Sequence, residues 1–248
     1  MLKYFFYNVK DIPSQYQWQP YHLGYWTWIL ILSILVVIMA NIYKKSNHKN
    51  QILKGIAILI CVQEALKDIL HYTAGSLTLS HLPLHLCGIS IFMVTWHAFK
   101  PNKLNSEFIY ALTLPGAIIA LACPDWTQYP LLHFSSVNSF TMHTWLIMYV
   151  VIQLYAGTLI PNFKNLKYTF VFTLLLMIPI YFINKVWDTN FFFINTPSPG
   201  SPSVVLYDLF GNGFVLSYII ICLILWILMY LPWRYYENKG NIVHPELS

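Results

Sequence analysis

Charged residues are scarce in this chain of 248 residues, where Asp, Glu, Lys and Arg together make up only 9%. A soluble domain carries about 25% charged residues, so this shortfall excludes a globule with a fully hydrated surface. It suits a protein whose outer surface faces lipid, where charge is costly. The chain is also 57% hydrophobic, and a single membrane domain accounts for its length.

Cysteine is rare as well, which excludes two further classes of protein. No CxxC pair occurs, so neither a disulfide framework nor a zinc-finger pattern is present. The net charge of +5 does not indicate nucleic acid binding, because the lysines are scattered between apolar runs. Residues 1–19 lack an apolar core, so we expect no cleavable signal peptide. The four cysteines are Cys61, Cys87, Cys123 and Cys222.

Seven mostly apolar stretches are long enough for membrane-spanning helices, which need roughly 20 such residues. They cover 23–42, 51–71, 80–99, 107–123, 137–159, 168–184 and 213–231. The sequence therefore predicts an all-α, polytopic membrane helical bundle of about seven transmembrane helices. We expect an extracytoplasmic segment at 1–22, the seven-helix domain at 23–233 and a cytoplasmic tail at 234–248.

The distribution of Lys and Arg tests this map and orients it. The connections alternate strictly, with ten of these residues on one side and three on the other. Cytoplasmic loops carry the excess, so we predict a multi-pass cell membrane protein with its N-terminus outside and its C-terminus in the cytoplasm. The ten are Lys44, Lys45, Lys49, Lys54, Lys100, Lys103, Lys164, Lys167, Arg234 and Lys239, and the three are Lys3, Lys10 and Lys185.

Polar residues in the predicted helix at 51–71 require an explanation, because such groups are expensive within a membrane. Glu64, Lys67, Asp68 and His71 are spaced so that all four lie on one helical face. One interpretation is a structural cluster in which the two carboxylates neutralise the lysine. The other is the wall of a polar site, and the two are compatible.

The run SHLPLHLCG at 80–88 opens the next predicted helix. Pro83 is tolerable in a first helical turn, which places Cys87 about six residues into the helix, at roughly 9 Å depth. On such a helix His85 faces away from Cys87, whereas His81 and His85 share a face and either bind a metal or make interior hydrogen bonds. Cys87 itself is either a small buried apolar residue or a reactive thiol.

His143 also lies about six residues from the outer end of its predicted helix, so its depth matches that of Cys87 and of Glu64. A Cys near a His is a nucleophile with its base, and the thiolate attacks an acyl carbon. Asn184 or Asn190 either donates to an oxyanion or ends a helix as a cap.

The run LPLHLC at 82–87 resembles the signature of YwaF-like bacterial integral membrane proteins. This family is similar to a vertebrate transmembrane acyltransferase that remodels ether phospholipids and, more distantly, to the androgen-induced membrane hydrolases. The matches extend over nearly the whole chain from the second helix onward. Beyond the first run they are Tyr129-Pro130, His133, His143, Asn184, Asn190-Phe191-Phe192-Phe193, Pro197, Asp208-Leu209-Phe210-Gly211 and Leu231-Pro232-Trp233.

The resemblance implies a nucleophile and a base within the membrane, which by motif would be Cys87 and His143, and a membrane lipid as substrate. We expect no cofactor, no metal and no nucleic acid partner. Gly88 stands where many members carry an acidic or amide residue, so an orienting partner is either missing or supplied by Glu64 or Asp68.

Three hypotheses follow. The first is lipid acyl transfer or ester hydrolysis by a Cys87–His143 dyad in the outer third of the bilayer. The second is a transporter or receptor whose polar site is formed by Glu64, Lys67, Asp68 and His71. The third is a haem or metal protein with ligands among His71, His81, His85 and His143.

Overall fold

The computed structural model describes residues 4–7, 9–198 and 200–238, and every regular element in these ranges is helical. Five stretches are long and apolar enough to cross a membrane: Leu23–Lys45, Leu79–Phe99, Lys103–Ala122, Phe163–Trp187 and Phe214–Tyr235. The chain is therefore an all-α, multi-pass membrane protein. Lys3 and most of the predicted tail, with Lys239, lie outside the described residues.

Helices α2 (Lys49–Thr73) and α6 (Phe134–Ala156) are as long as spanning helices but more polar. α6 is the central helix and packs against α1 (Leu23–Lys45), α2 and α5 (Leu114–Ala122). Several of its polar residues are buried inside the protein, which is where a helix within a membrane tolerates them. These buried residues include Ser136, Asn138, Thr144 and Gln153.

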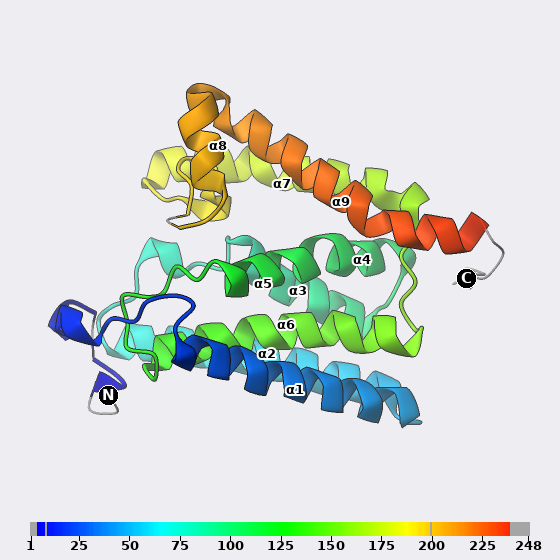
Figure 1. The fold of residues 1–248 in the computed structure, drawn as a ribbon, viewed down its shortest axis with the longest axis horizontal. Helices are drawn as coiled ribbons and strands as arrows, with labels where there is room; N and C mark the ends of the chain where they lie inside the picture. The colour runs from blue at the N-terminus through cyan, green and yellow to red at the C-terminus, as the bar shows by residue number, and fades with distance from the viewer. Residues whose placement is uncertain (1–3, 8, 199, 239–248) are drawn as a thin grey trace.

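The long helices run side by side along one direction (Figure 1). α1, α2 and α6 form one side of the bundle, and α7 (Leu166–Trp187) and α9 (Phe214–Asn238) form the other. α3 (Leu86–Phe99) and α4 (Lys103–Phe108), with α5, lie between them. The first described residues and the end of α9 lie at opposite ends of the bundle, here called the N-terminal end and the C-terminal end.

The main hydrophobic core joins α2, α3 and α6 and reaches Tyr230 on α9. Two smaller clusters lie nearer the N-terminal end of the bundle. One gathers the aromatic rings of Trp18, Trp126 and Phe140, and the other packs Phe191 of the α7–α9 connection against residues around the start of α3. The beginning of α3 is therefore held by apolar contacts with the α7–α9 connection.

The predicted helix at 80–99 is wrong in its first turn. A 3-10 turn, η4 (Leu79–His81), is followed by non-helical backbone, and α3 begins only at Leu86. The residue before a proline is disfavoured in the α conformation, and Leu82, before Pro83, is extended at φ −57° and ψ 142°. His81 and His85 therefore do not share a helical face, and the predicted 200° between His85 and Cys87 does not apply.

The predicted helix at 107–123 is part of a longer stretch that contains a π-helical segment, η5 (Ile109–Thr113), between α4 and α5. Pro115 has no N–H to donate to the carbonyl of Ala111, four residues earlier. That carbonyl instead accepts a hydrogen bond from Nε1 of Trp226 on α9, at 2.6 Å. The break in the helical ladder is thus used to attach α9 to the bundle.

Other segments cover the N-terminal end. The residues before α1 are attached to the α5–α6 connection, where Trp18 N donates to Thr127 O at 3.3 Å and Phe134 N donates to Phe5 O at 3.0 Å. The α7–α9 connection contains η7 (Phe191–Phe193), α8 (Ser203–Phe210) and η8 (Gly211–Gly213).

Candidate active site

Cys87 is the second residue of α3, directly at the start of the helix. His85 precedes the helix in extended conformation, and its side chain does not cap the backbone. The first N–H that bonds back is that of Ile89, to His85 O at 3.0 Å. Among the described residues, the N–H groups of Leu86, Cys87 and Gly88 have no acceptor, as expected for the first turn of an uncapped helix.

Gly88 allows the chain to fold back onto this turn. A Cβ atom at position 88 would lie 2.6 Å from Cα and 2.7 Å from the carbonyl carbon of Pro83. No side chain fits without moving the backbone that leads into α3. The expected acidic or amide residue is therefore excluded here by the close approach of Pro83.

His143 contacts Cys87 from α6. Its Nε2 atom lies 3.2 Å from Sγ of Cys87, and its Nδ1 atom lies 2.7 Å from the carbonyl oxygen of Ser139. A carbonyl only accepts, so Nδ1 carries the proton and Nε2 presents its lone pair to the thiol. This tautomer is the one in which the ring accepts a proton from sulfur.

The imidazole is held on one face by Trp126. The two rings stack with centroids 5.4 Å apart and an interplanar angle of 8°. Trp126 is buried and also packs edge-on against Phe140. Cys87 and His143 each keep part of their surface accessible, so the pair is not sealed inside the bundle. The site combines a fixed ring with a thiol that is only partly enclosed.

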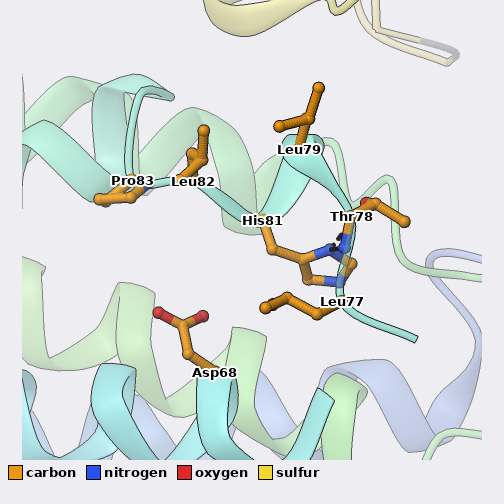
Figure 2. A pocket seen from close by; sticks show the side chains of 7 residues that line it. All are labelled: Asp68, Leu77, Thr78, Leu79, His81, Leu82 and Pro83. Atoms are coloured by element: carbon orange, nitrogen blue, oxygen red, sulfur yellow. Dashed lines mark hydrogen bonds between the residues drawn. The ribbon is translucent and has the colours of Figure 1, made fainter. Parts of the chain in front are cut away.

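An open pocket of ≈490 Å³ lies between α2 and the segment that leads into α3 (Figure 2). Figure 2 shows the Asp68 carboxylate pointing from α2 towards this segment, which carries His81. His81 Nδ1 accepts from Thr78 N at 3.1 Å, so its Nε2 carries the proton. The lining residues are Asp68, Leu77, Thr78, Leu79, His81, Leu82 and Pro83. Because Pro83 packs on Gly88, the pocket lies close to the start of α3.

Comparison with family models decides the relationship of this chain to known proteins. The model of the TMEM164 family matches residues 17–230, a range that includes Cys87, His143 and most of the helical bundle. The chain belongs to the TMEM164 family. No curated protein and no solved structure matches it. The narrower resemblance to YwaF-like proteins stays a prediction.

The polar face of α2 in this TMEM164-family chain is largely satisfied internally. Lys67 Nζ lies 2.6 Å from Glu64 Oε1 and 3.3 Å from Asp68 Oδ1. His71 contacts Ser76 Oγ at 2.9 Å through Nδ1, and its ring lies 4.2 Å from that of His81. Neither carboxylate contacts His143, whose orienting partner is the Ser139 carbonyl. Of Glu64, Lys67, Asp68, His71 and His81, only Asp68 and His81 line the pocket.

The remaining predicted site residues, His85, Asn184 and Asn190, contact the α7–α9 connection. His85 packs against the rings of Phe191 and Phe193, each with a centroid distance of 5.1 Å. Asn184 Nδ2 donates to Phe191 O at 2.9 Å and its Oδ1 accepts from Phe191 N at 2.8 Å.

Asn190 also forms hydrogen bonds within the α7–α9 connection. Its Oδ1 accepts from Asn195 N at 3.1 Å and Thr196 N at 3.2 Å, and its Nδ2 donates to Thr196 O at 2.9 Å. The amides of Asn184 and Asn190 are thus occupied by backbone groups of the α7–α9 connection. No group of three or more His, Cys, Asp or Glu side chains with metal-binding geometry occurs in the described part of the chain.

Two contributors to the site were missed from the sequence. Nothing in the position of Trp126 along the chain indicates that its ring stacks on that of His143. Ser139 contributes only its carbonyl, which follows from the helix itself, because it lies four residues before His143.

Proposed function

We propose that this protein transfers acyl chains between membrane lipids through a thioester on Cys87. The observation that supports the proposal is the 3.2 Å contact between Sγ of Cys87 and the unprotonated Nε2 of His143. Membership of the TMEM164 family agrees with it, because the family implies acyl transfer on ether lipids. A neutral base within reach of the nucleophile is the arrangement that covalent catalysis requires.

In the first step Cys87 attacks the ester carbonyl of a donor lipid while His143 Nε2 takes the thiol proton. The tetrahedral intermediate collapses, the ester C–O bond breaks, and His143 gives the proton to the leaving alkoxide, which departs as the lipid alcohol. In the second step His143 takes the proton of an acceptor hydroxyl, whose oxygen attacks the thioester. The thiolate leaves and is reprotonated by His143, so the dyad returns to its starting state. Water as acceptor gives hydrolysis by the same steps.

The start of α3 supplies the stabilisation of negative charge. The N–H groups of Cys87 and Gly88 are unpaired among the described residues and lie at the positive end of the helix dipole. Donors placed where an oxyanion develops are worth about 10²–10³ in rate each. They replace Asn184 and Asn190 in this role, since those amides hold the α7–α9 connection.

We also propose seven membrane crossings, made by α1, α2, α3, the α4–α5 stretch, α6, α7 and α9, with the N-terminal end outside the cell. The ten-to-three distribution of Lys and Arg supports this topology, as do the positions of the first described residues and of the end of α9 at opposite ends of the bundle. Replacing Ser14 or Asn47 by cysteine, in a chain without native cysteines, tests it. An impermeant maleimide applied to intact cells should label Ser14→Cys and spare Asn47→Cys, and the reverse result contradicts the topology.

A lipid-like, thiol-reactive acyl probe tests the chemistry. In detergent-solubilised protein we expect stoichiometric labelling of Cys87 that is lost in Cys87→Ser and falls strongly in His143→Ala. Cys222→Ser is the matched control, because Cys222 is another partly buried thiol. Equal weak labelling of all four cysteines contradicts the proposal. The transporter or receptor hypothesis requires that Cys87→Ala be harmless and that Glu64→Gln lose uptake or binding.

A further inference from the structure

We propose that Gln63 of α2 is a positioning residue for His143, which it serves by fixing the rotation and depth of α6. The inference rests on the proposed function in treating the Cys87–His143 contact as the reactive one. Gln63 itself touches neither member of that pair in any hydrogen bond of the described residues.

The amide of Gln63 is bonded at both ends to α6. Its Nε2 donates to Asn138 Oδ1 at 3.0 Å and to Thr141 Oγ1 at 2.9 Å, and it also lies 3.0 Å from Asn138 O. Its Oε1 accepts from Trp145 Nε1 at 3.0 Å. An indole N–H only donates, so Trp145 fixes which end of the amide is oxygen.

The three partners lie on the side of α6 that faces away from Cys87. Asn138, Thr141 and Trp145 follow i, i+3 and i+7 spacing and share one helical face. His143 is two residues from both Thr141 and Trp145, which corresponds to roughly 200° of rotation. Gln63 therefore holds the back of α6 while His143 projects from its front.

The dyad has little tolerance for a shift of this helix. A slip of one residue moves α6 by about 1.5 Å along its axis and rotates it by about 100°. Either change removes Nε2 of His143 from its 3.2 Å contact with Cys87. A misplacement of about 1 Å can lower a catalysed rate about 10²-fold.

α2 is suited to this role because it packs against both α3 and α6. It also contacts α3 through Cys61 Sγ, 3.2 Å from Thr95 Oγ1. The other side-chain hydrogen bond between α6 and α3, apart from the dyad, joins Tyr149 to His97 at 2.9 Å and lies further along both helices. Gln63 is thus the polar connection to α6 near the level of His143.

The test is the rate of alkylation of Cys87 by iodoacetamide as a function of pH, followed by mass spectrometry in the intact solubilised protein. Gln63→Leu should lower the rate at neutral pH by about tenfold or more and give the pH profile of His143→Ala. Adding Gln63→Leu to His143→Ala should cause no further loss. Tyr149→Phe, which removes an interhelical hydrogen bond of α6 away from the dyad, should keep the wild-type profile.

A folded Gln63→Leu protein with the wild-type alkylation rate and profile would overturn the proposal. Should this variant fail to fold, Trp145→Phe removes the hydrogen bond to Gln63 Oε1, together with part of the ring that packs against the core, and it should shift the profile in the same direction. A wild-type profile in Trp145→Phe would likewise count against it. Alkylation needs no acyl chemistry, so loss of reactivity in Gln63→Leu supports the positioning role even if no acyl probe labels Cys87.

Discussion

The ring of His143 is held between two fixed atoms: its Nδ1 donates to Ser139 O at 2.7 Å and its Nε2 lies 3.2 Å from Sγ of Cys87. The contact with Ser139 O keeps the proton on Nδ1, so the lone pair of Nε2 faces the thiol of Cys87. No carboxylate is needed to orient the imidazole ring, because the helix that carries His143 also supplies the acceptor for its Nδ1 proton.

Gly88→Ala should destabilise the protein and separate the dyad, because the added Cβ would lie 2.6 Å from Cα of Pro83. Overpacking of this kind costs about 1–3 kcal/mol. Gly55→Ala on α2 is the control: its Cβ meets nothing within 4 Å, and alanine favours the helix by about 0.5–1 kcal/mol. Denaturant unfolding in detergent measures both, and equal stability of the two variants contradicts the packing described here.

Lys67→Met should destabilise the bundle more than the double variant Glu64→Gln/Lys67→Met. Lys67 and Glu64 side chains are only 18% and 17% exposed, so removing the lysine leaves Glu64 without its ion-pair partner. Asp68, which lies 3.3 Å from Lys67 Nζ, loses the same partner in both variants, but its side chain is 40% exposed. Breaking one partner of a buried pair costs about 3–5 kcal/mol, whereas replacing both is often neutral. Unfolding midpoints decide the order, and a double variant as unstable as the single one argues against the neutralising role of Lys67.

Tyr230→Phe should destabilise the C-terminal end of the bundle. The Tyr230 hydroxyl donates to Glu107 Oε2 at 2.5 Å, while Oε1 accepts from Asn162 N at 2.9 Å. Without the hydroxyl a buried carboxylate oxygen loses its donor, at a cost of about 1–3 kcal/mol. Tyr168→Phe, at a half-exposed tyrosine on α7, should change the unfolding free energy by less than about 0.5 kcal/mol. A similar small change in Tyr230→Phe would contradict this account.

His133 should make stability depend on pH. It accepts from Ser135 N at 3.0 Å through Nδ1 and donates to Tyr7 O at 2.9 Å through Nε2. Burial lowers its pKa below the ordinary value of about 6.5. As pH falls below about 6.5 the unfolded chain binds the proton first, so stability should fall until the folded pKa is passed and then level off.

His133→Asn keeps a side chain that can cap α6 but removes the titrating group. Its unfolding free energy should therefore be flatter than that of the wild type between about pH 7 and pH 5. Parallel curves for the two proteins would assign the pH dependence to another group.

The apolar runs located the long helices, since length and composition suffice to recognise a helix within lipid. The effect of each proline on the backbone was harder to predict. Pro83 was interpreted as a first-turn residue, yet the same residue also disfavours helix at Leu82, and only the packing of Pro83 on Gly88 selects the second outcome. The π-helical segment before Pro115 likewise involves a distant residue. Its Ala111 carbonyl accepts a hydrogen bond from Trp226, which lies 115 residues further along the chain.

The proximity of Cys87 and His143 was predicted from matched depths, but the structure achieves it differently. Cys87 is the second residue of α3, not the sixth or seventh. The non-helical segment before α3, rather than a longer helix, places Cys87 at the level of His143. His143 is the tenth residue of α6, counted from Phe134. Trp126 and Gln63 act through contacts between distant segments, which no local pattern in the sequence indicates.

The separation of Cys87 and His143 along the chain has a consequence for biosynthesis. They are 56 residues apart, and α4 and α5 lie between them. A ribosome adds about 5–20 residues per second, so a nascent chain carries the thiol for about 3–11 s before its base has been made. The chemistry proposed for Cys87 therefore requires that α6 has joined the bundle.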